Sequence, residues 1–182
     1  MSRRSRGPDG RLYIATLSGK IQALELDDQY NVLSKQLIPS IQDLPNNNIL
    51  GIGFSPWEPA THFRIYVGHA KLYINSGMVG VRPAPYIGHV SAMQGPLFAP
   101  VPLITGLPSS NHDHGVNGIS FDNRGQLYVP VGGNTNAGVP NPNVGGFDES
   151  PLSETILVAA IRDPSFEGSF FYTDSRTGLP SL

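Results

Sequence analysis

The stretch that decides the fold reads Asp9-Gly10-Arg11-Leu12-Tyr13-Ile14-Ala15. An Asp-Gly pair tolerates the positive φ values of a tight hairpin turn, and the alternation after it places side chains on both faces of a strand. The stretch recurs as Asn123-Arg124-Gly125-Gln126-Leu127-Tyr128-Val129-Pro130, and a more degenerate copy reads His69-Ala70-Lys71-Leu72-Tyr73-Ile74-Asn75. The sequence therefore contains an internal repeat in which a turn leads into a strand.

The spacing of this repeat indicates the architecture. Tyr13, Tyr73 and Tyr128 recur at intervals of about 55 to 60 residues, which fits one four-stranded antiparallel propeller blade with its loops. We predict an all-β fold, a β-propeller, in one domain over residues 1–182, with blades at roughly 7–60, 61–120 and 121–182. The alternative is a β-sandwich with coincidentally similar hairpins, and the regular spacing favours the propeller.

Two other segments predict strands. Gly19 separates two short alternating runs, so we expect a hairpin between residues 12–16 and 21–26. The apolar segment 151–161 is compatible with a helix or a buried strand, and its short length and β-branched residues favour a strand over 155–161.

Composition limits the class of protein. The chain has 182 residues, with 21 glycines, 17 prolines, 14% charged residues and no cysteine, which is typical of a folded, turn-rich domain without disulfides or zinc–thiolate sites. A net charge of −2 gives no field that would attract nucleic acid or an anionic membrane. No apolar run approaches the roughly 20 residues of a membrane span. Arg3, Arg4 and Arg6 are expected in a frayed terminus, and the first residues lack the apolar core of a signal peptide.

Three blades are too few for a closed ring, because each blade needs a neighbour on both faces. We therefore expect a fragment of a longer protein or a chain that self-associates through its open blade edges. The start at a Gly-Pro-Asp-Gly turn and the end in the turn-like residues 177–182 fit the first expectation.

The densest polar cluster, residues 107–118, contains His112-Asp113-His114 beside glycines. A histidine titrates in the range that general-base catalysis needs, and a neighbouring carboxylate can orient it. A loop that leads into a propeller strand would direct these groups toward the ring axis. Three interpretations remain open on the residues alone: a general base or cofactor contact, a structural hydrogen-bonding loop, and a metal site of His112 and His114 whose third ligand is not evident.

Several motifs resemble one family. Asp113-His114, Gly118-Ile119-Ser120-Phe121-Asp122 and Gly125-Gln126-Leu127-Tyr128-Val129-Pro130-Val131-Gly132 resemble the active-site blade of the soluble quinoprotein glucose/sorbosone dehydrogenases. Asn48-Ile49-Leu50-Gly51-Ile52-Gly53-Phe54-Ser55-Pro56 resembles an earlier strand of that family. The resemblance covers roughly residues 7–160.

The resemblance implies a six-bladed propeller that binds pyrroloquinoline quinone, with calcium nearby, and oxidises sugar hydroxyls. It implies that His114 is the general base and also contacts the cofactor, and that Asp113 orients His114. It further implies that Asn46 contacts the cofactor, although the family more often has glutamine there. It also implies a sugar-like small-molecule partner and a location outside the cytoplasm.

One departure concerns the segment 132–138. The family has Gly-Asp and then a quinone-binding arginine here, whereas this chain offers only Asn134 and Asn136 as possible cofactor contacts. Loss of a charge-stabilising donor costs about 2.7–4 kcal/mol of transition-state stabilisation. The chain is thus expected to be a dehydrogenase fragment or, alternatively, a non-catalytic binding module that has lost the arginine. A weaker third interpretation is a metal-dependent, lactonase-like propeller that uses His112 and His114.

Overall fold

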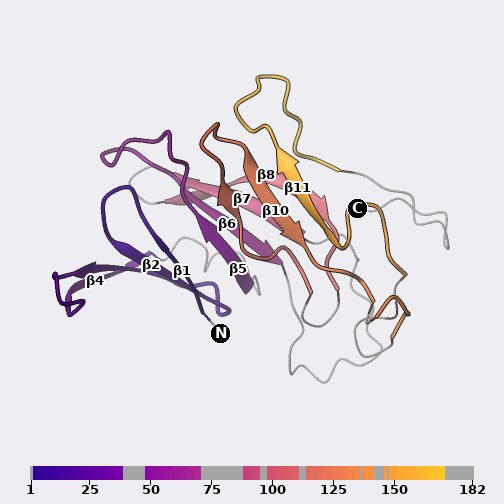
Figure 1. The fold of residues 1–182 in the computed structure, drawn as a ribbon, viewed down its shortest axis with the longest axis horizontal. Coiled ribbons are helices and arrows are strands. Elements are labelled where there is room, and N and C mark those ends of the chain that lie inside the picture. Colours follow the sequence, from indigo (N-terminus) through magenta and orange to yellow (C-terminus); the bar gives the residue numbers. More distant parts are fainter. Residues whose placement is uncertain are drawn as a thin grey trace.

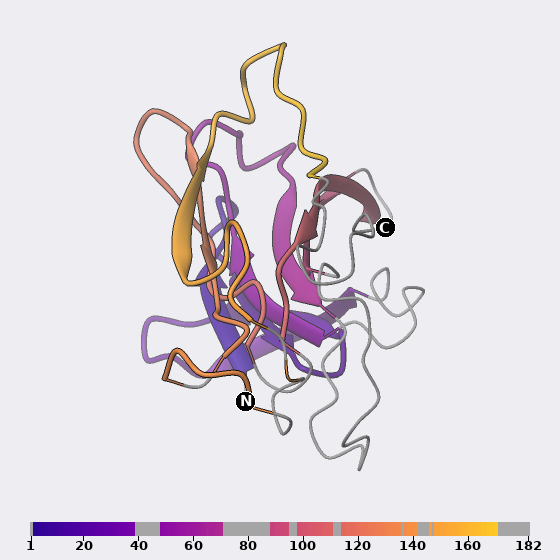
Figure 2. The same cartoon turned by 90° about the vertical axis from the view of Figure 1, so that its right-hand side faces the viewer.

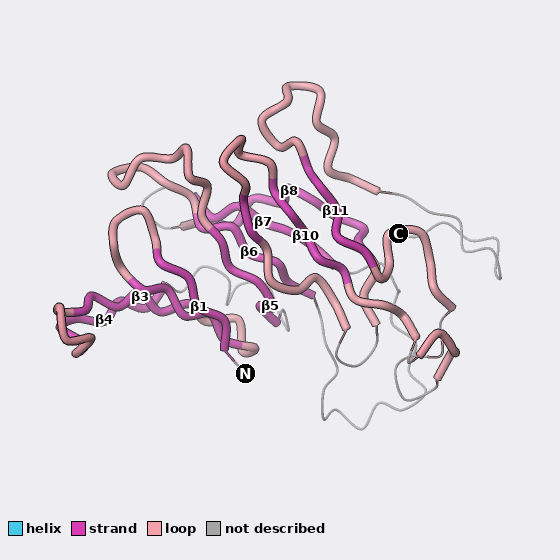
Figure 3. The backbone as a smooth tube through the Cα atoms, viewed as in Figure 1, coloured by secondary structure: helices cyan, strands magenta, loops and turns pink. Residues whose placement is uncertain are grey.

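The computed structural model describes residues 2–38, 48–70, 88–94, 98–110, 114–135, 137–141, 146 and 148–170. Over these residues the chain is built from strands and loops, and Figure 3 contains no helix. Accordingly, the described part of the chain has no helix long and apolar enough to cross a membrane. The strands are β1 (Ser2–Arg6), β2 (Leu12–Thr16), β3 (Ile21–Leu26), β4 (Val32–Ile38), β5 (Asn48–Gly53), β6 (Ile65–Ala70), β7 (Gly88–Gln94), β8 (Ala99–Leu107), β9 (Ser120–Phe121), β10 (Leu127–Val131) and β11 (Thr155–Ala159).

These strands form three sheets in which neighbours in sequence pair antiparallel. The orders are β1-β2-β3-β4, β5-β6-β7-β8 and β11-β10-β9, which we call sheets 1, 2 and 3. The predicted all-β class is confirmed. The predicted blade limit near residue 60 differs from this grouping, because β5 pairs with β6 in sheet 2 rather than with the strands of sheet 1.

The three sheets succeed one another in chain order, and their first strands lie together (Figure 1). β5 contacts β1 and β2 of sheet 1 on one side and β9 of sheet 3 on the other. The first strand of each sheet therefore lies innermost, and the later strands extend outward from this line of contact. This is the radial arrangement that the sequence repeat predicts.

The repeated turns fold as expected. Gly10 and Gly125 adopt φ values of 82° and 81°, and their N–H groups donate to the carbonyls of Gly7 and Asp122 at 3.0 and 3.1 Å. A side chain is unfavourable at such positive φ values, so glycine ends both turns. The predicted hairpin of residues 12–16 and 21–26 is confirmed as β2 and β3. The strand predicted over 155–161 is observed as β11, which ends at Ala159, but it is not the buried strand that was expected, because Ile156 and Val158 are 63% and 53% exposed.

The repeat prediction needs one correction in sheet 2. Tyr13 and Tyr128 do occupy the same place, the second residue of the second strand in their sheets. In sheet 2 that place belongs to Tyr66, because the second strand is β6 and it ends at Ala70. Tyr73, which the repeat search selected, lies after β6 and outside the described residues.

These tyrosines join successive sheets. The buried Tyr13 ring lies 4.9 Å from Phe54, which follows β5, and the buried Tyr66 ring lies 4.8 Å from Phe121 in β9, both centroid to centroid. Each tyrosine thus packs on the phenylalanine at the end of the next sheet's first strand. Two apolar clusters fill the spaces around these pairs. The first joins sheets 1 and 2, and the second joins sheets 2 and 3.

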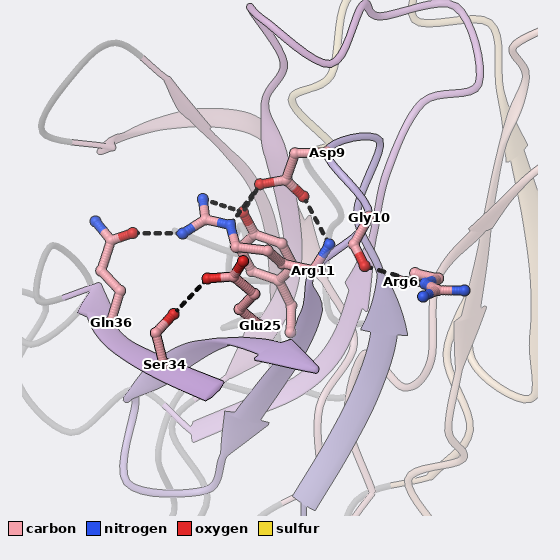
Figure 4. A network of polar contacts seen from close by, with 8 residues as sticks. Arg6, Asp9, Gly10, Arg11, Glu25, Ser34 and Gln36 are labelled. Carbon is pink, nitrogen blue, oxygen red and sulfur yellow. Dashed lines mark hydrogen bonds and ion pairs between the residues drawn. The ribbon is translucent and has the colours of Figure 1, made fainter. Parts of the chain in front are cut away.

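An ionic contact accompanies each buried tyrosine. Arg11 Nε lies 2.6 Å from the Asp9 carboxylate, and the Tyr13 hydroxyl donates to the same carboxylate at 3.0 Å; the surrounding network is drawn in Figure 4. In sheet 2, Glu58 accepts from Tyr66 Oη at 2.8 Å and pairs with Arg64. The acid therefore satisfies the hydroxyl that burial removes from water.

The N-terminal arginines also need a correction. They were expected in a frayed terminus, but Ser2–Arg6 is strand β1, paired along its length with β2. Arg6 Nε donates to the Gly10 carbonyl at 3.0 Å and so supports the first turn (Figure 4).

Candidate functional site

His114 lies in the loop between β8 and β9, at the end of sheet 2 where β5 begins and β6 ends. Its backbone is fixed by two buried serines. The Ser110 N–H donates to the His114 carbonyl at 2.6 Å, the His114 N–H donates to Ser110 Oγ at 2.9 Å, and Ser109 Oγ donates to the same carbonyl at 3.3 Å. Ser109 and Ser110 therefore fix the part of the loop that carries the histidine.

The His114 ring is held by a backbone carbonyl. Nδ1 lies 3.1 Å from the Gly133 oxygen, and the side chain is half-buried. A carbonyl oxygen only accepts hydrogen bonds, so Nδ1 carries the proton in this contact. The lone pair of the neutral ring then lies on Nε2, the state that a general base requires.

Residues 114–119, the His114 segment, run between sheets 2 and 3. The Gly132 N–H donates to the Gly115 carbonyl at 3.0 Å, which joins the segment to the end of β10. On the other side, a Cβ atom at Gly51 of β5 would collide with the backbone of Asn117. Glycine at Gly51 thus allows β5 to approach the segment closely, which explains why this residue type stands in the second family-like motif.

The loop after β10 is anchored by a carboxylate. Glu149 accepts hydrogen bonds from the backbone N–H groups of Asn134 and Thr135 at 2.9 and 2.8 Å, and from the hydroxyls of Thr135 and Ser153 at 2.5 and 2.6 Å. Burial tends to raise the pKa of Glu149. The hydroxyls of Ser153 and Thr135 and the two N–H groups outweigh burial, so the pKa lies below its ordinary value.

Two of the predicted cofactor contacts, His114 and Asn134, lie within the described residues. The Asn134 side chain is 1% exposed, and its amide nitrogen donates to the Asp148 carbonyl and to Ser150 Oγ, both at 3.1 Å. Within the described residues its Oδ1 has no hydrogen-bond partner. The donor groups of Asn134 thus hold the loop, and its contact with a cofactor stays a prediction. The other predicted site residues lie outside the described residues and also stay predictions: Asn46, Asp113 and Asn136.

A second pair of histidines lies in sheet 2. His69 on β6 faces His89 on β7 with 5.3 Å between ring centroids, and His69 Nε2 lies 2.9 Å from Ser91 Oγ. Burial, and to a smaller extent the neighbouring His89, lowers the pKa of His69 to about 3. Burial also lowers the pKa of His89. Both rings are therefore neutral near pH 7.

This histidine pair does not join His114. His69 shares a face of β6 with Val67, which packs in the cluster between sheets 1 and 2. Ala70, on the opposite face, lies against the His114 segment near Gly115. In the described part of the chain, no three His, Cys, Asp or Glu side chains gather as a metal site, and His112 lies outside that part.

Sequence reasoning singled out His114, whose catalytic role stays a prediction, and it missed the described partners of this residue. Glu149 acts on backbone N–H groups, and Gly133 contributes only a carbonyl, so neither role depends on a recognisable motif. The His69–His89 pair left no sequence signal either, because its two members come from strands joined by a long connection.

The three radial sheets with their innermost first strands define the class of fold as an incomplete β-propeller. Two sugar dehydrogenase structures are among the solved structures that share it. One is the PQQ-bound form of aldose sugar dehydrogenase from Streptomyces coelicolor, with a TM-score of 0.56, 19% identity, and coverage of 90% of this chain and 47% of that chain. The other is an oxidoreductase described as a glucose dehydrogenase from Thermus thermophilus, with a TM-score of 0.50, 18% identity, and coverage of 87% and 46%.

The chain thus spans about half the length of these propellers. The predicted partial propeller and its likeness to sugar dehydrogenases are confirmed at the level of the fold. No protein-family model matches the sequence, and no curated protein matches it.

Proposed function

We infer that this chain is half of a sugar dehydrogenase-like propeller and that His114 is its proton acceptor. The observation that carries the proposal is the hydrogen bond from His114 Nδ1 to the Gly133 carbonyl, in a fold shared with half of a sugar dehydrogenase. This bond places the lone pair of the neutral ring on Nε2. A polar, sugar-like substrate fits the proposed chemistry because its hydroxyl groups supply the proton.

The role of His114 follows from the balance of the oxidation. When a hydroxyl is oxidised to a carbonyl, its carbon loses a hydride and its oxygen loses a proton. His114 Nε2 accepts the proton, and the hydrogen bonds between its backbone and Ser110 keep the ring in place. Pyrroloquinoline quinone, when bound, would supply the two-electron acceptor.

The described neighbours of His114 do not by themselves fit a reduced quinone. Its described contacts are with Ser109, Ser110, Gly132 and Gly133, none of which carries a positive charge. A reduced quinone carries negative charge that a cationic donor would stabilise. We therefore assign the proton acceptor to this chain and derive no step through the cofactor. Quinone and calcium binding remain proposals from the resemblance.

Titration and turnover test the proposal together. Pyrroloquinoline quinone with Ca²⁺ is titrated into the 182-residue chain while the quinone absorbance is followed, and dye reduction is then measured with glucose. His114→Ala is expected to lower the rate by about 10²–10⁴-fold, the usual contribution of a general base. His62→Ala is the matched control, because His62 is exposed in the loop between β5 and β6. Undiminished dye reduction in His114→Ala would remove this histidine from the mechanism.

The second candidate is a non-catalytic binding module. It is favoured by the segment 132–138, which has Asn134 and Asn136 but no arginine where the resembled family has one. This candidate predicts that the wild-type chain binds a sugar or the quinone but reduces no dye, and that His114→Ala changes affinity alone. Calorimetry with glucose in the absence of quinone distinguishes it from the dehydrogenase proposal.

A further inference from the structure

We propose that Glu149 is a positioning residue for His114, which it orients through the single peptide group that joins Gly133 to Asn134. The Gly133 carbonyl accepts from His114 Nδ1 at 3.1 Å, and the Asn134 N–H donates to Glu149 Oε2 at 2.9 Å. The catalytic consequence of this contact rests on the proposed function, whereas the positioning itself does not.

The planarity of the peptide bond couples the two contacts. A trans peptide holds its C=O and N–H groups in one plane and pointing in opposite directions. When Glu149 fixes the Asn134 N–H, it therefore also fixes the direction of the Gly133 carbonyl. The Glu149 carboxylate, the peptide group and the His114 imidazole therefore form a continuous chain of hydrogen bonds. Each bond in this chain polarises the next.

The carboxylate is itself held in place. It accepts hydrogen bonds from the backbone N–H of Thr135, the residue after Asn134. It also accepts from the hydroxyls of Thr135 and Ser153. With the Asn134 N–H this makes four donors for two oxygens, so the side chain has one well-defined orientation. Asn134 closes the same loop through its amide, which donates to the Asp148 carbonyl next to Glu149.

Gly133 lies close to two glutamate side chains. A Cβ atom at Gly133 would lie 2.6 Å from Glu154 Cγ and 3.0 Å from Glu149 Oε1. The two carboxylate side chains therefore occupy the space that a side chain at this position would need. The negative charge of Glu149 makes the Gly133 oxygen a better acceptor, which favours the Nδ1–H tautomer of His114.

The tautomer of His114 can be measured without any cofactor. The chain has five histidines, so ¹⁵N-histidine labelling with long-range ¹H–¹⁵N correlation gives five ring patterns, and His114→Ala assigns one of them. At alkaline pH, wild-type His114 is expected to show a protonated Nδ1 and an unprotonated Nε2. Glu149→Ala is expected to shift this pattern toward Nε2–H. Glu149→Gln is expected to restore it in part, since an amide oxygen still accepts from the Asn134 N–H.

The matched control is Asp27→Ala. Asp27 also accepts from two backbone N–H groups, those of Gln29 and Asn31 at 2.9 and 2.7 Å, but in the β3–β4 turn of sheet 1. This variant should leave the His114 pattern unchanged. If Glu149→Ala does not fold by circular dichroism, Thr135→Ala removes one donor to the carboxylate, and a smaller shift in the same direction is expected.

Two results would overturn the proposal: a wild-type His114 with its proton on Nε2, or a folded Glu149 variant with an unchanged Nδ1–H pattern. Dye reduction separates this inference from the proposed function. If the tautomer of His114 responds to Glu149 variants but the chain oxidises no sugar, the positioning role of Glu149 is supported. The catalytic role of His114 is then rejected.

Discussion

At the scale of single residues, the buried tyrosine hydroxyls show how an interface between sheets tolerates a polar atom. Tyr13 Oη donates to Asp9 and accepts from Arg11 at 2.8 Å, while Tyr66 Oη donates to Glu58. Burial, followed by the hydrogen bond to the carboxylate, raises the pKa of both tyrosines. The phenols therefore remain protonated donors across the physiological range.

Removal of either hydroxyl is expected to weaken the fold modestly. Tyr13→Phe and Tyr66→Phe each leave a carboxylate without one donor, and each should lower the free energy of unfolding by about 1–3 kcal/mol, the range for hydrogen bonds to charged groups. Urea denaturation measures the loss. Tyr30→Phe should change nothing, because Tyr30 is 81% exposed. If the urea midpoints of Tyr13→Phe and Tyr66→Phe equal that of Tyr30→Phe, the two buried hydroxyls do not stabilise the fold.

The buried histidine His69 predicts a specific pH dependence of stability. Its folded pKa of about 3 lies below the ordinary 6.5, so the unfolded chain binds this proton first. The contribution of neutral His69 to the free energy of unfolding is thus fully present above pH 6.5. It is lost as the pH falls toward 3, by up to about 1.4 kcal/mol per pH unit. His69→Gln should flatten this part of the curve in thermal unfolding. His62→Gln, at an exposed site, should retain the wild-type slope.

At the scale of elements, close contact between β5 and the His114 segment depends on Gly51. An added Cβ would meet the Asn117 carbonyl and lie 2.9 Å from the Ile119 nitrogen, both rigid backbone atoms. Gly51→Ala is therefore expected to lower the free energy of unfolding by about 1–3 kcal/mol, as overpacking does. Gly118→Ala is the control, since nothing lies within 4 Å of its Cβ. Chemical denaturation of both variants checks the difference.

The elements also show what the sequence could predict. The β2–β3 hairpin was predictable because a glycine turn joins two alternating runs, and such a turn fixes the register locally. The strand around Tyr66 was missed because a long loop, rather than an Asp-Gly turn, precedes it. The acid that serves Tyr66, Glu58, comes from that loop, so it stands at a different spacing from Asp9 before Tyr13.

The candidate site was predictable only in part. His114 stood out because its residue type has a chemistry of its own and because the flanking motifs resemble a known family. The Gly133 carbonyl and the Glu149 carboxylate act through backbone groups that every residue possesses. Only the three-dimensional path of the loop after β10 brings them together, and local sequence patterns do not encode that path.

At the scale of the whole molecule, the half-ring leaves its last sheet open. Tyr128 holds the same place in β10 as the buried tyrosines of the other two sheets, yet it stays partly exposed. After β11 the chain returns to β8, where the Thr105 N–H donates to the Gly168 carbonyl at 2.8 Å. Among the described strands, β11 is therefore an edge of sheet 3, and Figure 2 shows it at the side of the molecule.

This edge is where we expect the chain to self-associate. β11 reads Thr-Ile-Leu-Val-Ala without a charge, and its Ile156 and Val158 are 63% and 53% exposed. An exposed apolar edge strand is a template for pairing with another strand. Another outer strand, β4, has exposed apolar residues too, but its Lys35 is the kind of edge charge that opposes such pairing.

Light scattering across a range of protein concentrations tests this difference between the two edges. The double variant Ile156→Lys, Val158→Lys should shift the chain toward monomer, because strand pairing would bury two uncompensated charges. Leu33→Lys on β4 should leave the distribution of species unchanged, although Leu33 is 62% exposed. If the β4 variant dissociates the assembly and the β11 variant does not, the open face of sheet 1 is the contact surface. That outcome would mean that Lys35 does not prevent association through β4. Exposed apolar area would then outweigh edge charge in this molecule.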